Sequence, residues 1–285
     1  MQLLRTWMFV PGHRQKMVDK ALKLGQGATI LDLEDGVPAT EKALAREGIA
    51  AALGQGGNKA VYFVRIHQCG SREMAADLDA VVRPGLDGLV LAKVEGVDDV
   101  LQVDATLRQL EKAGGLQQGH VQLLATIESA RGLTQAPNIA GACPRLMGLM
   151  FGAEDFALDL GLFAGSAGDL LYARSALVVA AASQQLQAVD RVCPDFRDSE
   201  GLQQDALQAR QIGFTGKALI HPSQIEIVDQ VFHPTEAEIE WARRVVQAFE
   251  EAEAVGQGAV AVDGQMVDLP VVERARRLLA THFST

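Results

Sequence analysis

The sequence predicts an α/β fold, a (β/α)8 TIM barrel with a C-terminal helical and hairpin extension. Short apolar runs recur at a steady interval between Thr6 and Pro222, and segments of helical periodicity follow them. This alternation is typical of repeated strand–helix units in a parallel sheet. The length of 285 residues suits one such barrel, which takes about 250 residues. The rival doubly wound sheet requires G-x-G-x-x-G after its first strand, where this chain has PGHRQKM.

The predicted strands follow from the apolar runs in chain order. Their nearly continuous apolar character is typical of strands that are buried on both faces. Four of the segments between them are amphipathic and end at a glycine, which suits a helix C-terminus; they span residues 16–25, 41–54, 97–114 and 200–213. The eight predicted strands are Thr6–Pro11, Ala28–Glu34, Ala60–Ile66, Gly88–Val94, Val121–Glu128, Leu146–Gly152, Gln187–Cys193 and Gly216–Pro222.

The repeat pattern ends with the eighth strand, and a C-terminal extension is predicted after it. Asp263 and Gly264, flanked by short apolar runs, predict a tight hairpin turn. Pro270 predicts the N-terminus of a last helix. We therefore expect a barrel over residues 1–222 and an extension over residues 223–285 that packs on the barrel or on a neighbouring subunit.

The charge of the chain restricts its partners. A formal net charge of -10 and a pI near 5.1 argue against nucleic acid or an anionic membrane as partner, because both require a basic surface. An anionic substrate would then need local arginines or a metal. Cys69, Cys143 and Cys193 lie far apart and are odd in number, which favours reduced thiols. The N-terminal apolar run is cut short by Pro11 and Gly12, so neither a signal peptide nor a membrane span is expected and the expected location is the cytoplasm.

Two carboxylates one barrel repeat apart predict a metal site. Glu128 ends the fifth predicted strand, and Asp155 follows the sixth. Active sites of α/β barrels lie at the C-terminal ends of the strands, and neighbouring strands are about 4.8 Å apart. Both acids can then bind one hard divalent cation, and Mg²⁺ prefers such oxygen ligands. The alternative for either acid is that it caps the helix that follows.

An arginine in a strand points to the same end of the barrel. Arg65 interrupts the apolar run VYFVRIH, and a buried guanidinium needs an anionic partner. That partner is either a carboxylate of the substrate or metal site, or an internal acid such as Asp32 or Glu34. Both interpretations place Arg65 in the mouth of the barrel.

The turn after the sixth strand offers backbone donors. Gly152, Ala153, Glu154 and Asp155 follow one another there, and successive N–H groups in such a turn can bind a substrate carboxylate. The simpler interpretation is that Gly152 is only a turn residue.

Basic residues follow the first strand. His13, Arg14 and Lys16 cluster positive charge in an acidic protein, which suits phosphate groups at the rim, or else they begin a solvated helix. Lys93 ends the fourth strand, and His221 ends the eighth. A structural role is the favoured interpretation of His221.

Seven motifs run in order along the chain: RTWMFVPG, ILDLEDGVP, VRIH, ATIESARG, GLMFGAEDFALDLG, GFTGKALIHPSQI and GQMVDLPVVERA. Together they resemble the citrate lyase beta subunit-like family of the HpcH/HpaI aldolase superfamily. This group of metal-dependent acyl-CoA lyases includes malyl-CoA and citramalyl-CoA lyases. The resemblance covers essentially the whole chain. It implies a (β/α)8 barrel, a homotrimer or hexamer, Mg²⁺ as cofactor with Mn²⁺ as the alternative ion, and coenzyme A as part of the substrate.

The resemblance also implies roles for single residues. Glu128 and Asp155 match the family's metal ligands. Arg65 matches the arginine that polarises the reacting carbonyl or thioester oxygen, and Glu34 matches an acid beside the metal's waters. Asp268 resembles the aspartate that the C-terminal segment delivers into the neighbouring subunit's site.

The remaining matches concern the substrate. Arg14 and its surroundings match the region that meets the phosphates of coenzyme A. Ala153 and Glu154 belong to the turn described above, which suits a substrate carboxylate beside the metal ligand. Two positions depart from the family pattern: His67, where Asn is frequent, and Gly36, where Ala or Ser is usual. These departures concern the substrate side and leave the metal site intact.

The function implied is a Mg²⁺-dependent carbon–carbon lyase. It would cleave, or form, a β-hydroxyacyl-CoA such as malyl-, citramalyl- or citryl-CoA, giving an α-keto acid and an acyl-CoA. Such chemistry needs charge stabilisation on oxygen and a proton carrier, which a divalent ion, an arginine and a carboxylate supply. The alternatives are a thioesterase on the same substrates, a class II pyruvate aldolase, and a non-catalytic subunit of a citrate lyase-type complex.

Overall fold

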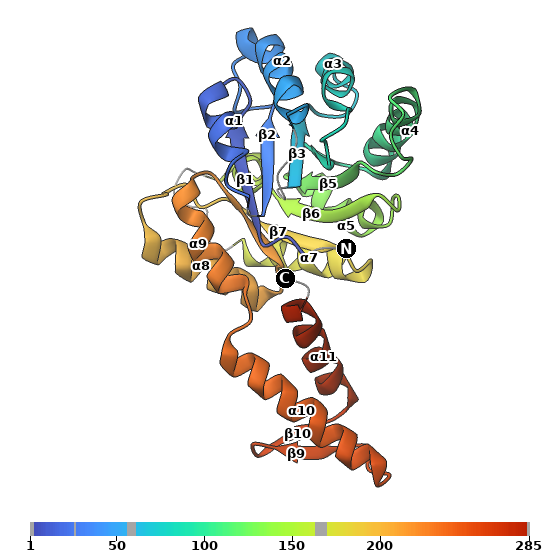
Figure 1. Ribbon diagram of the computed structural model, residues 1–285, viewed down its shortest axis with the longest axis vertical. Helices are drawn as coiled ribbons and strands as arrows, with labels where there is room; N and C mark the ends of the chain where they lie inside the picture. Colours follow the sequence, from blue (N-terminus) through green and yellow to red (C-terminus); the bar gives the residue numbers. More distant parts are fainter. Residues whose placement is uncertain (1–2, 26, 56–60, 163–169, 284–285) are drawn as a thin grey trace. The chain divides into compact units, whose positions relative to one another are not determined.

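The computed structural model contains a closed barrel of eight parallel strands, and it describes residues 3–25, 27–55, 61–162 and 170–283. The strands pair in sequence order, and the last pairs with the first (Figure 1). The predicted fold class is confirmed, with all eight strands present; Ala60, at the start of the third predicted strand, lies outside the described residues. The strands are β1 Thr6–Pro11, β2 Ala28–Asp32, β3 Val61–Ile66, β4 Gly88–Leu91, β5 Gln122–Ile127, β6 Leu146–Phe151, β7 Gln187–Asp190 and β8 Gly216–Leu219.

Helices follow the strands around the outside of the barrel (Figure 1). The four predicted amphipathic helices are confirmed as α1 (Gln15–Ala21), α2 (Lys42–Leu53), α4 (Val97–Ala113) and α8 (Ser199–Ile212). None of the described helices combines the length and the apolar character needed to cross a lipid bilayer. The barrel helices are α1 Gln15–Ala21, α2 Lys42–Leu53, α3 Arg72–Val81, α4 Val97–Ala113, α5 Ala130–Ala140, α6 Ala153–Asp159, α7 Leu171–Ser183, α8 Ser199–Ile212 and α9 Ile225–Phe232, with short 3-10 turns η1 Ala39–Glu41 and η2 Pro222–Gln224.

The strand period explains both the core and the position of the polar residues. Each strand contributes a buried apolar side chain to one cluster inside the barrel. Successive side chains of a strand point to opposite faces, so the next inward position of β2, β3 and β5 is occupied by Asp32, Arg65 and Thr126. The polar layer therefore lies directly above the apolar one. The cluster includes Trp7, Ile30, Phe63, Val90, Leu124, Met150, Val189 and Ala218.

The C-terminal residues form a compact unit of their own. The unit that contains the barrel spans Leu4–Asp229, and the second includes the chain from Gln230 onward. In it, two helices pack together beside an antiparallel hairpin, as the sequence predicted. The turn residues Asp263 and Gly264 have φ values of 50° and 76°, the left-handed conformation of a tight hairpin turn. The elements are α10 Glu236–Ala254, β9 Val260–Val262, β10 Gln265–Val267 and α11 Leu269–Phe283.

Candidate functional site

A pocket of about 230 Å³ lies at the C-terminal ends of the barrel strands. Its walls come from the strand ends of β1, β3, β5 and β6, from the first turn of α6 and from the segments after β2 and β7. Five predicted site residues line it: Arg65, Glu128, Ala153, Glu154 and Asp155. The other lining residues are Phe9, Asp35, Thr126, Met150, Phe151, Gly152, Val192 and Ala218.

Arg65 is held by internal acids. Its Nε and Nη2 donate to the two carboxylate oxygens of Asp32 at 2.6 and 2.7 Å, and its Nη1 lies 3.3 Å from Glu34 Oε2. Burial alone would lower the pKa of Arg65, but the hydrogen bonds and charge of Asp32, then the charges of Glu34 and Glu128, raise it above its ordinary value. Arg65 therefore pairs with the internal acids that the sequence left as one alternative, and it still lines the pocket.

Asp32 is a residue that the sequence did not assign to the site. Besides holding Arg65, its carboxylate accepts hydrogen bonds from the backbone N–H groups of Glu34 and Gly36, both at 2.9 Å. These bonds explain why β2 ends at Asp32 rather than at Glu34: the backbone turns around the Asp32 carboxylate. The signal in the sequence was the alternation of Asp32 and Glu34 at the end of an apolar strand, which places two acids two residues apart.

Glu128 is buried at the end of β5, with 6% of the residue exposed. One of its oxygens accepts a hydrogen bond from the backbone N–H of Lys93 at 2.5 Å. Burial, and after it the charge of Asp155, raise the pKa of Glu128 to about 8. Gly152 leaves room for it, because a Cβ at that position would lie 2.5 Å from Glu128 Oε2. Without a bound cation, burial therefore favours the protonated form of Glu128.

Lys93 links the acids of the pocket. Its Nζ donates to Glu34 Oε1 at 2.6 Å and to Asp35 Oδ2 at 3.0 Å, and it lies 4.0 Å from Asp155 Oδ2. Burial would lower the pKa of Lys93, but Glu34 and Asp35 raise it well above its ordinary value. Its backbone has φ 53°, a left-handed conformation that is uncommon for a side-chain-bearing residue. The sequence marked Lys93 as the end of a strand but gave no sign of this conformation.

Acids outnumber bases in this part of the barrel. Among the described residues around the pocket, five carboxyl groups interact with the cationic side chains of Arg65 and Lys93, and Lys42 donates to the backbone carbonyls of Leu33 and Glu34. The five belong to Asp32, Glu34, Asp35, Glu128 and Asp155. Excess negative charge in a partly buried site favours a cation.

Glu128 and Asp155 suit such a cation because Mg²⁺ in proteins is usually held by one or two carboxylates, with waters and substrate completing its shell. Within the described ranges, no group of three or more His, Cys, Asp or Glu side chains is placed so that it could hold a metal ion. The donor set therefore fits an open Mg²⁺ site better than a closed structural one.

Several candidate residues are not among those that line this pocket. Arg14 is exposed before α1 and is not among the lining residues. Asp268 belongs to the C-terminal unit, where its carboxylate accepts a hydrogen bond from the N–H of Val271 at 3.4 Å. His221 stacks on Phe196 with ring centroids 4.7 Å apart and bonds Ser223, in agreement with a structural role. The proposed roles of Arg14 and Asp268 remain predictions.

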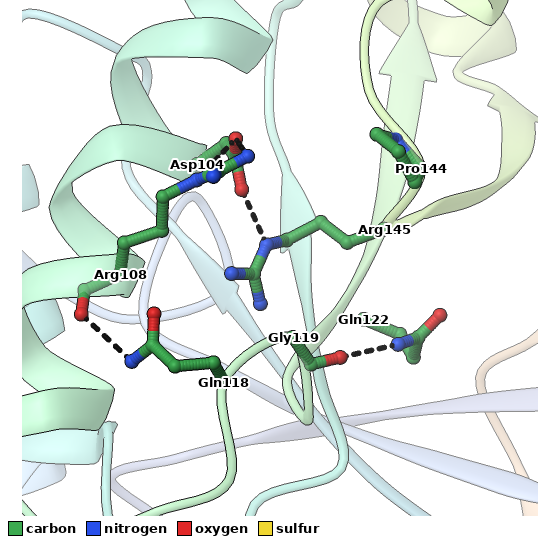
Figure 2. Close-up of a pocket in the computed structure, with 7 residues that line it drawn as sticks. All are labelled: Asp104, Arg108, Gln118, Gly119, Gln122, Pro144 and Arg145. Atoms are coloured by element: carbon green, nitrogen blue, oxygen red, sulfur yellow. Dashed lines mark hydrogen bonds and ion pairs between the residues drawn. The ribbon is translucent and has the colours of Figure 1, made fainter.

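A second pocket of about 250 Å³ lies at the opposite, N-terminal end of the strands, between α4 and the starts of β5 and β6 (Figure 2). Arg145 donates there to Asp104 at 2.6 Å and to Glu111 at 2.7 Å. Asp104 also accepts from Arg108 at 2.8 Å. Two acids thus meet two bases, and this end of a barrel serves stability in characterised enzymes.

The sequence and the fold match known proteins over nearly the whole chain. Residues 5–222 match the family model described as HpcH/HpaI aldolase/citrate lyase, and residues 170–277 match the model described as C-C bond lyase of the TIM-barrel fold. The citrate lyase subunit beta of Haemophilus influenzae is 38% identical over 98% of this chain and 97% of its own length. The (3S)-malyl-CoA thioesterase of Cereibacter sphaeroides is 37% identical over 97% of this chain and 93% of its own length.

A solved structure extends these matches. The CitE protein of Mycobacterium tuberculosis, crystallised in complex with magnesium, acetoacetate and coenzyme A, has a TM-score of 0.80 and 32% identity to this chain, and covers 99% of it and 98% of its own length. The predicted resemblance is thereby confirmed. With its eight-stranded barrel and these matches, the chain belongs to the HpcH/HpaI aldolase/citrate lyase family.

Proposed function

We propose that this protein is a Mg²⁺-dependent carbon–carbon lyase acting on a β-hydroxyacyl-CoA such as malyl-, citramalyl- or citryl-CoA. It releases an α-keto acid and an acyl-CoA, or condenses the two. The observation that carries the proposal is geometric: Glu128, Asp155 and Arg65 line one pocket at the C-terminal ends of the barrel strands. Burial favours the protonated form of Glu128, and metal binding requires the deprotonated form, so a bound cation would displace that proton. Relatives among citrate lyase beta subunits and a magnesium complex of a similar fold support this choice of ion.

Glu128 and Asp155 would hold the ion, and Mn²⁺ would suit the same oxygen donors. When bound, Mg²⁺ supplies Lewis acidity to an oxygen of the keto acid. Ala153 and Glu154 open α6 beside these ligands, and the first N–H groups of a helix have no partner within it. They are suited to a substrate carboxylate.

Arg65 would stabilise charge on the thioester oxygen as the acyl-CoA leaves as an enolate. Its position is fixed by the two bonds to Asp32, so little reorganisation is needed when charge develops. Glu34 approaches both Arg65 and Lys93 and would orient water beside the ion. Arg14 would meet the phosphates of coenzyme A at the rim.

Asp268 would carry a proton to or from the enolate carbon, a role worth about 10² to 10⁴ in rate. We propose that it comes from a neighbouring copy in a homotrimer or hexamer. In its own unit it is flanked by the exposed apolar side chains of Met266 and Leu269, which suit a surface that another copy covers. Sedimentation, and complementation between Asp268→Asn and Glu128→Gln chains, test this arrangement: two inactive chains should regain activity when mixed.

The proposal is tested by incubating each thioester with protein and Mg²⁺ and measuring the released keto acid. Activity should disappear with chelator and in Glu128→Ala and Asp155→Ala variants that remain folded. Full activity in either variant would show that other residues hold the ion. Absence of turnover on all three thioesters would show that the protein is not a lyase of this class.

A thioesterase is the second candidate, because a relative that is 37% identical carries the name (3S)-malyl-CoA thioesterase. The same ion and a carboxylate base can activate water against the thioester. Free coenzyme A released without acyl-CoA would favour it. Turnover of a keto acid and an aldehyde without coenzyme A would instead favour a class II aldolase, and activity only after addition of partner subunits would favour a citrate lyase-type complex.

A further inference from the structure

Thr126 is a buried polar residue inside the barrel with no assigned role. It lies on the inner face of β5 between Leu124 and Glu128, and it lines the pocket at the C-terminal end of the strands. The residue is 5% exposed. Its Oγ1 is buried and has no hydrogen-bond partner among the described residues.

A buried hydroxyl without a partner needs an explanation. Buried polar groups are nearly always hydrogen-bonded, and an unsatisfied one destabilises the fold. Valine has the same shape and an equal preference for strands, so packing alone does not require threonine here. The other buried unsatisfied atoms in the described ranges belong to Arg5, His13, Arg83 and Arg191; none of these residues lines this pocket.

The surroundings of Thr126 indicate what its hydroxyl can bind. Its methyl group Cγ2 faces Gly152, where a Cβ would lie 3.1 Å away. The nearby lining residues Phe9, Met150 and Ala218 are apolar and offer the hydroxyl no partner. A rotation about χ1 by one staggered step moves the hydroxyl into the position that the methyl group occupies beside Gly152, a residue of the pocket wall.

The charged side-chain donors at the pocket are already engaged. Arg65 is bonded to Asp32, and Lys93 is bonded to Glu34 and Asp35. Among the described lining residues, Thr126 therefore offers the uncharged side-chain donor, beside the backbone N–H groups that open α6. Because Glu128 is two residues away on the same face of β5, a ligand held at Glu128 comes within reach of this hydroxyl.

We propose that Thr126 is a binding residue for the α-keto acid and donates its hydroxyl hydrogen to an oxygen of that acid. This inference rests on the proposed function, and it names a further residue that selects the keto acid. The hydroxyl has no partner among the described residues, so its hydrogen bond to the acid would be gained without breaking one within the protein.

The test compares Thr126→Val, which removes the hydroxyl and keeps the shape, with Thr126→Ser, which keeps the hydroxyl. Binding of pyruvate to the Mg²⁺-loaded protein is measured by calorimetry, and the thermal midpoint is measured without ligand. Thr126→Val should weaken pyruvate binding by about tenfold, the value of one hydrogen bond. It should leave Mg²⁺ affinity unchanged and raise the thermal midpoint, whereas Thr126→Ser should stay within about threefold of wild-type affinity.

Three results would overturn the inference: unchanged pyruvate affinity in Thr126→Val, a lowered midpoint in that variant, or no pyruvate binding by the wild-type protein. The first would leave the hydroxyl without a binding role, and the second would make it structural. Failure of the proposed function is separate, because it is read from thioester turnover. If Thr126→Val loses pyruvate while no thioester is cleaved by the wild-type protein, the inference holds and the lyase function falls.

Discussion

The pocket at the C-terminal end of the barrel and the pocket in Figure 2 have similar volumes, about 230 and 250 Å³, and charged side chains line both. They differ in charge balance. In the N-terminal pocket Arg145 and Arg108 match Asp104 and Glu111, and these groups bond one another. In the C-terminal pocket acids exceed bases, and a buried carboxyl has its pKa raised to about 8 by burial first.

This difference in charge balance indicates that the N-terminal pocket serves stability and the C-terminal pocket serves binding. A closed ion network satisfies its members and leaves nothing for a ligand, whereas unbalanced charge in a cavity costs stability until a partner arrives. Their similar volumes do not distinguish the two pockets, whereas the chemistry of their side chains does. The following changes test this contrast, from the largest expected effect to the smallest.

Arg145→Met should destabilise the fold by about 3–5 kcal/mol, because it leaves buried acids without their partner. The side chains of Asp104 and Glu111 are 9% and 0% exposed. Arg108→Met is the matched control: Arg108 is 62% exposed, so its loss should cost about 1 kcal/mol or less. Denaturant unfolding measures both, and equal losses in the two variants would contradict the structural assignment of this pocket.

Glu128→Gln should have the opposite effects: activity should be lost and stability should be kept. Lyase activity should fall at least about a hundredfold, since a metal supplies several kcal/mol of charge stabilisation. Stability without Mg²⁺ at pH 8 should not fall, because one of several crowded acids is removed. Steady-state assay and thermal unfolding provide the two readouts, with the exposed Glu200→Gln as control. Retained activity would show that Glu128 does not hold the ion.

The contribution of Glu128 to the stability of the ligand-free protein should decrease as pH rises. The pKa of Glu128 is about 8 in the folded state against 4.5 ordinarily, with burial as the main cause. Between these values the folded state keeps a proton that the unfolded state has lost, so this contribution to stability is present at acid pH and is lost as pH rises towards 8. The slope is at most about 1.4 kcal/mol per pH unit.

Subtracting the Glu128→Gln curve from the wild-type curve isolates this slope from other titrating groups. Mg²⁺ binding at pH 7 should also release a proton, which calorimetry in buffers of different ionisation enthalpy detects. A flat difference curve, with no proton release, would mean that Glu128 is ionised before the metal arrives.

Lys93→Met should have the smallest effect. The Lys93 ammonium bonds Glu34 and lies near Asp155, so its removal should raise Mg²⁺ affinity by up to about tenfold, equivalent to 1.4 kcal/mol. The Lys93 side chain is one-third exposed, which limits the loss of stability. Lys93→Arg keeps the charge and should bind Mg²⁺ like the wild type; weaker binding by Lys93→Met would place the lysine among the groups that support the ion.

Much of the fold and part of the site followed from the sequence, for identifiable reasons. Strand period and the rule for barrel strand ends were enough to place Arg65, Glu128 and Asp155 at one pocket. The partner of Arg65 stayed open because Asp32 and Glu34 are two residues apart in the sequence, a spacing that puts both on the same face of an extended chain. The register of β2 with β3, which pairs Asp32 with Arg65, shows which acid lies opposite the arginine.

Other features depend on backbone geometry and packing that no residue pattern encodes. The bond from the Lys93 N–H to Glu128 requires a left-handed residue after β4. The unsatisfied hydroxyl of Thr126 depends on which atoms the barrel interior brings near it. Asp268 belongs to a separate compact unit, so its part in the site remains a prediction.

The left-handed backbone of Lys93 has a consequence for laboratory evolution. Glycine adopts that conformation without strain, whereas other residues pay about 1 kcal/mol or more for it. A selection for heat resistance alone should therefore favour Lys93→Gly, which relaxes the backbone while keeping the N–H that meets Glu128. A selection for turnover should keep the ammonium, because it holds Glu34, the acid proposed to orient water beside the ion, as well as Asp35. Position 93 is thus a place where thermostability campaigns and activity campaigns on this barrel should diverge.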